Sequence, residues 1–165
     1  TGDGLWIYGE TYDKYYLSAT GWRKDESGLA PVATLGLGAW IKAYTNGTVY
    51  QVGIVTNTSS FNVAAAATGY SFIANPFPAD LDVNTDISWT GIVTGGSTPT
   101  SSDRLLIWNG VKYDYYYYSV VGETTNGWYS TVNKGKAPLI RAGEGFFLQR
   151  KSSNAAAIPV ANPLD

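Results

Sequence analysis

The stretch Gly69 to Asp82, GYSFIANPFPADLD, decides the fold because it predicts a buried strand that ends at a fixed corner. Aromatic and β-branched residues in its first half favour β structure, and Asn75-Pro76 then ends the strand, since proline lacks the N–H that a ladder needs. Related features lie on both sides of it. We therefore expect a central linking strand within 69–93 and a single β domain over 1–165.

Composition favours an all-β protein. Of the 165 residues, 44% are hydrophobic and only 15% are charged, and glycine (19) and tyrosine (13) are abundant. Globular domains usually carry about 25% charged residues. Low charge combined with many aromatic residues and turn formers is typical of strands and turns rather than of disorder.

The absence of cysteine and histidine excludes several kinds of chemistry. No disulfide, thiolate nucleophile, histidine base or Cys/His zinc site can form. A net charge of −2 offers no broad basic surface for nucleic acid. No apolar run approaches the ~20 residues of a membrane helix, so we expect no membrane insertion.

Turn signals place the expected elements along the chain. We predict aromatic hairpins within 1–21 and around Asn109-Gly110, and a further Asn-Gly turn at Asn46-Gly47. Segment 61–68 is predicted to be a strand or a loop of small side chains, and 87–93 a strand. Segments 22–28 and 122–136 are predicted to be surface loops.

An internal pseudo-repeat relates 3–42 to 103–149. Ala30-Pro31 aligns with Ala137-Pro138, and the gapless match continues through a Gly-x-Gly motif into an apolar pair. Convergence of two aromatic hairpins is the alternative to duplication. The aligned pairs are Gly36/Gly143, Gly38/Gly145, Trp40/Phe147 and Ile41/Leu148, and with small gaps Leu5/Leu105, Ile7/Ile107, Tyr8/Trp108, Tyr12/Tyr113 and Trp22/Trp128. The fold expected is an antiparallel β-sandwich or flattened barrel made of two related, interleaved halves.

The repeat is out of phase with the ends of the sequence. Val160-Ala161-Asn162-Pro163 resembles Ile73-Ala74-Asn75-Pro76, so each half is expected to lack a strand. The chain's own tail or the tail of a neighbouring copy would supply it, because an open strand edge recruits a partner. This predicts that Ile158, Val160 and Leu164 lie at an interface.

The order GYSFIANPFPADLDV, RLLIWNGVKYDYYYY and IRAGEGFFLQRK resembles a β-rich module of secreted proteins from Bacteroidetes and Verrucomicrobia. That module runs G-N-P-Y-P-S, I-Y-V-W-x-G and P-G-Q-G-F-F-V. The resemblance covers 69–151, and this chain departs from it at Ala74, at Ala79-Asp80 and at Val83. It implies an extracellular or bacterial cell-surface location and brings no catalytic residues.

A run of alternating acidic and apolar residues is a candidate calcium site. A strand would place the oxygen-bearing side chains on one face, where Ca²⁺ would relieve their repulsion. A solvated strand face is the alternative, in which case no cofactor is expected. The candidate ligands are Asp80, Asp82, Asn84 and Asp86.

The aromatic residues allow three interpretations: core packing, a subunit interface, or a platform on which sugar rings stack. The six tryptophans are Trp6, Trp22, Trp40, Trp89, Trp108 and Trp128. The candidate interface residues are Tyr115, Tyr116, Tyr117 and Tyr118, whose rings alternate between the two faces of a strand. The candidate glycan-binding residues are Trp22, Trp128 and Tyr129.

The function expected first is that of an extracellular structural subunit that self-assembles with other copies into a filament or surface layer. The alternative is a carbohydrate-binding or adhesion module of a larger secreted protein, with polysaccharide as its partner. We do not expect an enzyme, because the spacing of Glu144 with Asp103 or Glu10 does not indicate an acid/base pair.

Overall fold

The computed structural model describes residues 3–8, 12–24, 28, 36, 38–45, 58–120, 126–151 and 154–164. Within these ranges the chain forms eleven β-strands and no helix. The strands are β1 (Gly4–Tyr8), β2 (Tyr12–Ser18), β3 (Gly21–Lys24), β4 (Ala39–Lys42), β5 (Ser60–Ala65), β6 (Gly69–Ala74), β7 (Arg104–Trp108), β8 (Tyr113–Ser119), β9 (Gly127–Ser130), β10 (Gly145–Arg150) and β11 (Ala156–Ala161).

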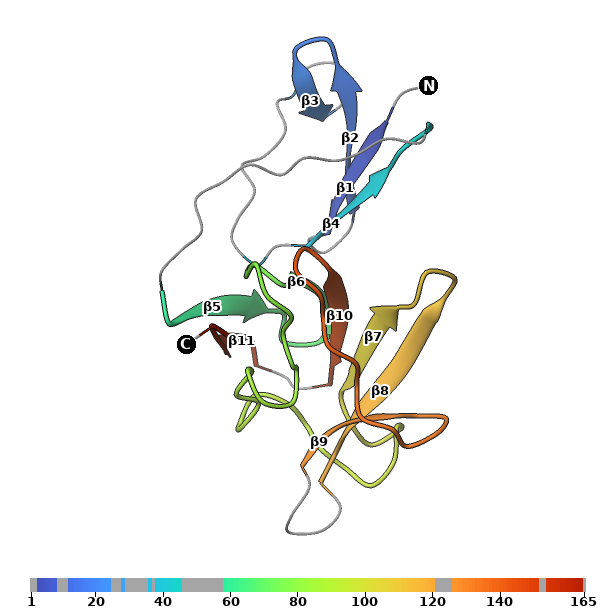
Figure 1. Ribbon diagram of the computed structural model, residues 1–165. Helices are drawn as coiled ribbons and strands as arrows, with labels where there is room; N and C mark the ends of the chain where they lie inside the picture. The colour runs from blue at the N-terminus through green and yellow to red at the C-terminus, as the bar shows by residue number, and fades with distance from the viewer. Residues whose placement is uncertain are drawn as a thin grey trace.

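The strands form three antiparallel sheets (Figure 1). The N-terminal sheet has the order β3-β2-β1-β4, the five-stranded sheet has the order β6-β10-β7-β8-β9, and β11 pairs with β5 in a ribbon. The all-β, antiparallel prediction is confirmed. Of the two predicted architectures, a sandwich or a flattened barrel, the structure is consistent with the sandwich, because the described strands do not close into a barrel. No described helix is long and apolar enough to cross a membrane.

The main core lies on one face of the five-stranded sheet. Alternate residues of its strands, such as Ile73, Leu105 and Phe146, are buried against the β5–β11 ribbon and the segment 77–89. The ribbon contributes Ile158 and Val160, whose exposed fractions are 0% and 1%. Burying large apolar side chains is worth roughly 1.5–3 kcal/mol each, so the ribbon is an integral layer of the sandwich.

The opposite face of the five-stranded sheet carries a smaller apolar cluster of Phe72, Leu106 and Phe147. Trp40 of β4 packs against this cluster, with its ring 5.6 Å from that of Phe72 and nearly parallel to it. Figure 1 shows the N-terminal sheet at the end of the five-stranded sheet where β6 and β10 lie, and Trp40 is its contact with this opposite, or outer, face.

The Gly-x-Gly motif makes this seating possible. The Gly38 N–H donates to the Phe72 carbonyl at 3.3 Å, and the Ala74 N–H donates to the Gly36 carbonyl at 3.0 Å. A Cβ on Gly38 would lie 2.5 Å from the Phe72 ring, and Gly36 has a φ of +78°. The Phe72 ring therefore lies against Gly38, where only the missing side chain leaves room for it.

The N-terminal sheet and four strands of the five-stranded sheet have the same pairing. β3-β2-β1-β4 corresponds to β9-β8-β7-β10, and Ile7 opposite Asp13 corresponds to Ile107 opposite Asp114. The glycines Gly36 and Gly143, which the pseudo-repeat aligns, both have a φ of +78°. Residues aligned in sequence therefore occupy equivalent positions, and duplication remains an inference from this likeness. Further matching pairs are Leu5↔Ile41 with Leu105↔Leu148, and Leu17↔Trp22 with Tyr118↔Trp128.

Two predicted loops prove to contain strands. Within 22–28, residues 22–24 belong to β3, and within 122–136, residues 127–130 form β9. Both are short strands that pair with a neighbouring hairpin, so their local sequence carries little periodicity. The charges of β3 suit an edge strand, where the Lys24 ammonium lies 2.7 Å from the Asp13 carboxylate.

The segment predicted as a strand over 87–93 is mostly turn. Ile87 makes one isolated bridge to Val160, and the Trp89 carbonyl then accepts the N–H groups of Ile92 and Val93. By contrast, segment 61–68, predicted as a strand or a loop, contains most of strand β5. The hairpin predicted around Asn109-Gly110 is confirmed by the pairing of β7 with β8. The predicted Asn46-Gly47 turn lies outside the described residues.

The tail pairs with its own chain. β11 runs antiparallel to β5 on one side, and on the other the Ser88 and Ala161 N–H groups bond to the carbonyls of Pro159 and Asp86. Ile158 and Val160 are therefore core residues, and the prediction that they offer a surface to another copy does not fit this burial. Leu164 is 64% exposed and stays accessible.

Candidate functional site

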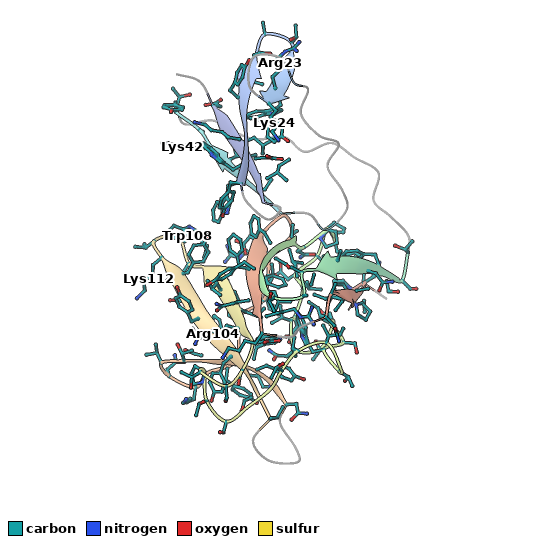
Figure 2. The ribbon with its side chains drawn as sticks, turned by 180° about the vertical axis from the view of Figure 1, so that it is seen from behind. Arg23, Lys24, Lys42, Arg104, Trp108 and Lys112 are labelled. Atoms are coloured by element: carbon teal, nitrogen blue, oxygen red, sulfur yellow. The ribbon has the colours of Figure 1, made fainter. Side chains whose placement is uncertain are left out.

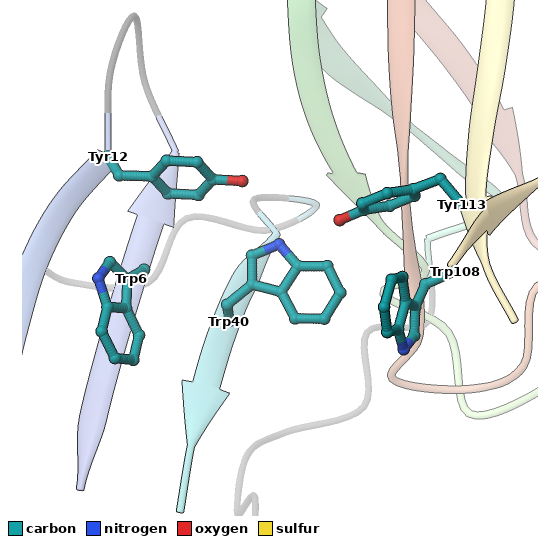
Figure 3. Close-up of a pocket in the computed structure, with 5 residues that line it drawn as sticks. All are labelled: Trp6, Tyr12, Trp40, Trp108 and Tyr113. Atoms are coloured by element: carbon teal, nitrogen blue, oxygen red, sulfur yellow. The ribbon is translucent and has the colours of Figure 1, made fainter. Parts of the chain in front are cut away.

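An aromatic cleft of about 420 Å³ opens where the N-terminal sheet meets the β7–β8 hairpin. Figure 3 shows Trp40 in the middle, with Trp6 and Tyr12 on one side and Trp108 and Tyr113 on the other. This volume lies within the usual range of ligand sites, about 300–1,000 Å³. We call it the aromatic cleft; its lining residues are Trp6, Tyr12, Trp40, Trp108 and Tyr113.

Strand pairing positions each ring. Trp6 of β1 lies directly opposite Trp40 of β4, and Tyr12 opens β2 next to the turn of the first hairpin. Trp108 and Tyr113 form the last pair of the β7–β8 ladder, and their rings are 5.1 Å apart. Residues directly opposite each other in a ladder point to the same face of the sheet. Trp6 therefore faces the same side as Trp40, and Trp108 the same side as Tyr113. The two hairpins therefore present aromatic rings to the cleft from both sheets.

Trp40 forms the junction between the cleft and the core. Besides its stacking on Phe72, its ring lies 6.1 Å from that of Trp108 and 6.3 Å from that of Tyr113, both at nearly right angles. Edge-to-face contacts of this kind contribute roughly 0.5–1.5 kcal/mol each beyond burial. The inner wall is therefore held in place, whereas Tyr12 and Trp108 are 46% and 42% exposed.

The Tyr113 phenol of the cleft lies in a partly dry environment. Burial, with contributions from Tyr12 and Tyr115, raises the pKa of Tyr113 to about 12. The Tyr113 hydroxyl is therefore protonated at neutral pH, and Figure 3 shows it and the Tyr12 hydroxyl directed toward the middle of the cleft. Tyrosine hydroxyls donate and accept hydrogen bonds, and tryptophan N–H groups donate them.

The chemistry of this lining is that of recognition. It offers flat apolar faces, hydroxyls and indole N–H groups, and no lining residue is a carboxylate or a nucleophile activated by a base. One charged neighbour, Lys14, holds its ammonium 5.6 Å from the centre of the Trp6 ring. A ligand with apolar C–H faces and hydroxyl groups would match both features of the lining.

The residues predicted to stack on a glycan lie elsewhere. Trp128 has an exposed fraction of 0% and packs against Trp89 and Tyr118, each at 5.1 Å, so it has no free ring face. Trp22 and Tyr129 are half-buried on β3 and β9, and neither lines the aromatic cleft. The residues predicted for a glycan site are therefore not those that line the aromatic cleft.

The acidic run does not form a strand with aligned carboxylates. Residues 82–86 form a turn in which Asp82 and Asp86 accept backbone N–H groups, of Asn84 and Asp82 respectively, at 2.7 Å. The Asn84 amide oxygen accepts the backbone N–H of Trp128, and Asp80 is exposed. The described residues contain no cluster of three acidic side chains able to hold a metal ion.

The tyrosine run is more buried than its sequence predicts. Tyr116 and Tyr117 are 9% and 5% exposed, and Tyr118 packs on the main core, because both faces of β8 are covered there. Tyr115, at 43%, remains accessible. Of the predicted interface residues, Tyr115 and Leu164 are thus the ones with exposed surface.

Of the carboxylates considered for catalysis, Asp103 and Glu144 do not line the cleft. Asp103 is fully buried, and its two oxygens accept the N–H groups of Thr94 and Lys151. Glu144 is exposed and accepts the Arg141 N–H at 3.1 Å. Glu10 lies outside the described residues.

The sequence alone does not distinguish Trp6, Trp40 and Trp108 from the other three tryptophans. The pseudo-repeat could have indicated part of the cleft. It aligns Tyr12 with Tyr113 and Tyr8 with Trp108, and so places aromatic residues next to the turn of each hairpin. A comparison of the chain with family models, with curated proteins and with solved structures gave no match in any of the three.

Proposed function

We propose that this chain is a non-catalytic binding module whose aromatic cleft holds a neutral glycan. The observation that carries the proposal is the convergence of five aromatic side chains from two sheets on one cleft of about 420 Å³. The C–H faces of a sugar ring pack on aromatic faces, and its hydroxyl oxygens accept hydrogen bonds from indole and phenol groups.

The charge distribution supports a neutral ligand at this cleft. The lining carries no ionised side chain, and Lys14 already lies over the outer ring, that of Trp6. An ionic ligand would lose hydration there and would find no opposite full charge among the lining residues. Neutral polysaccharide is therefore the ligand class that the lining suits.

Truncation of one exposed ring tests the proposal. Trp108→Ala removes a cleft face that is 42% exposed, so the fold should tolerate the change. We expect binding to a neutral polysaccharide, measured by calorimetry across a panel of glucans, xylans and mannans, to weaken by about tenfold, which is about 1.4 kcal/mol.

The matched control is Trp22→Ala, which removes a half-buried tryptophan outside the cleft. It should bind like the unmodified protein. The proposal fails if none of the polysaccharides binds, or if the two variants lose affinity equally.

Self-association is a second candidate, supported by the exposed aromatic residues on the outer face of the five-stranded sheet. Tyr70 and Tyr115 are 41% and 43% exposed on the face that also carries Phe72 and Phe147. Such a face suits a contact between copies in a filament or surface layer. Tyr115→Lys should then abolish assembly seen by electron microscopy, and unchanged assembly would exclude this face.

An extracellular or cell-surface location and an internal duplication complete the proposal. Low charge, abundant tyrosine and the resemblance over 69–151 support the location. The equal strand order and register of the two sheets support duplication, because unrelated hairpins have no reason to share glycine conformations and pairing partners.

A further inference from the structure

A second cavity, of about 310 Å³, lies beside the exposed edge of β8. The β8–β9 ladder ends at Tyr116, and beyond it the turn 131–136 lies beside the strand through a 3.0 Å bond from the Thr131 N–H to the Tyr115 carbonyl. We call this the lysine pocket. Its polar and aromatic lining includes Lys112, Asp114, Tyr115, Ser130, Asn133 and Lys136.

Two positive charges in this pocket are unpaired. Neither the Lys112 nor the Lys136 ammonium has a carboxylate or hydrogen-bond partner among the described residues. The one lining carboxylate, Asp114, already accepts the Asn109 side-chain N–H at 3.0 Å. Two ammonium groups against one carboxylate leave the pocket positive on a protein with a net charge of −2.

The remaining polar groups of the pocket are mainly donors. The Asn133 amide oxygen accepts the Gly135 N–H, which leaves its NH₂ group to donate. The Ser130 hydroxyl oxygen accepts the Val132 N–H at 3.2 Å, and its own O–H is free to donate. A group that brings several acceptor oxygens, such as a carboxylate or a sulfate, suits donors of this kind.

The turn that carries Lys136 is held in an unusual conformation. Lys134 has a φ of +62°, in the left-handed region of backbone conformation that residues other than glycine and asparagine rarely adopt. Its ammonium lies 4.9 Å from the centre of the Tyr117 ring and donates to the Tyr117 hydroxyl at 3.3 Å. This contact fixes the turn on the outer face of β8 and with it the position of Lys136.

We propose that the lysine pocket binds the anionic group of an acidic sugar, a carboxylate or a sulfate, with the sugar ring against Tyr115. Lys112 and Lys136 supply the charge, Asn133 and Ser130 supply further hydrogen bonds, and the 43% exposed Tyr115 ring supplies an apolar wall. This site is separate from the aromatic cleft and does not depend on glycan binding there.

Calorimetry with three sugar trimers tests the inference: a trigalacturonate, a galactose trimer sulfated on each unit, and the neutral galactose trimer. We expect at least one anionic trimer to bind about tenfold more tightly than the neutral one at low salt, with the difference shrinking as salt rises. The carboxylate and sulfate arms identify which anion the pocket takes. Lys112→Gln/Lys136→Gln should abolish the preference, and both side chains are exposed, so folding should be kept.

The matched control is Arg23→Gln/Lys42→Gln on the N-terminal sheet, which changes the net charge equally and lies away from the pocket (Figure 2). It should keep the preference. A wild-type protein without preference, an equal loss in control and pocket variants, or a pocket variant that still prefers the anion would each overturn the inference. Trp108→Ala in the aromatic cleft should leave the preference unchanged, which separates this test from that of the proposed function.

Discussion

At the scale of single residues, Asn75 shows how one polar side chain fixes the corner after β6. It is 4% exposed, donates to the carbonyls of Ala79 and Ile140 at 2.7 and 2.9 Å, and accepts the Phe77 N–H at 3.0 Å. This one amide pairs with the Phe77 N–H and the Ala79 carbonyl, and it shares the Ile140 carbonyl with the Leu81 N–H. The corner thereby leads the chain from the five-stranded sheet into the segment that covers the main core.

Asn75→Ala should therefore destabilise the protein by about 2–4 kcal/mol, because it leaves buried backbone groups without partners. Urea unfolding followed by tryptophan fluorescence measures this. Asn133→Ala is the control, since that residue is exposed and accepts one N–H in a surface turn, so its cost should stay below about 1 kcal/mol. Equal losses in both variants would refute the structural role assigned to Asn75.

Tyr113 gives the cleft a measurable response to alkaline pH. Its pKa is raised from 10.0 to about 12, so the folded state holds this proton more tightly than the unfolded state does. The resulting stabilisation is complete below about pH 10 and is lost as the pH rises through 12. Between pH 9 and 12 the free energy of unfolding should therefore fall less steeply with pH for Tyr113→Phe than for the unmodified protein. Equal slopes for the two proteins would contradict this.

At the scale of elements, β11 adopts one of the two pairings expected for the tail. The repeated Val160-Ala161-Asn162-Pro163 motif indicates a strand, and that strand pairs with β5 of the same chain. Its inward residues Ile158 and Val160 complete the sandwich. A tail this well buried is part of the folded unit.

Ile158→Ala should consequently cost about 2–5 kcal/mol, the range for large-to-small changes in a core. Leu164→Ala, three residues beyond the strand and 64% exposed, should change stability by less than about 0.5 kcal/mol. Thermal unfolding of the two variants compares them directly. If both variants matched the unmodified protein, the tail would not be a layer of the core.

Local signals predicted some elements and missed others for physical reasons. The strand and corner at 69–76 and the hairpin around Asn109-Gly110 are encoded by nearby residues. β3 and β9 are set by pairing with a hairpin, and neither has the length to display a period. The acidic run alternates like a strand, yet its side chains bond to their own backbone and form a turn instead.

At the scale of the whole molecule, the candidate site arises from the way two sheets meet. None of the cleft residues is distinguished by local sequence, because each is an aromatic residue of a strand, and the same types fill the core at Trp89 and Trp128. The cleft residues differ from the core tryptophans only in their position in the tertiary structure. The seating of Trp40 on Phe72 brings the two hairpins together and leaves Tyr12 and Trp108 open to solvent.

The most direct test of this account is a nuclear magnetic resonance titration of the six indole N–H signals with a polysaccharide fragment that binds. Binding at the junction of the two sheets predicts shifts for Trp6, Trp40 and Trp108, with Trp89 and Trp128 unmoved in the core. Shifts centred on Trp22, or a bound state in which none of the three cleft signals moves, would contradict it.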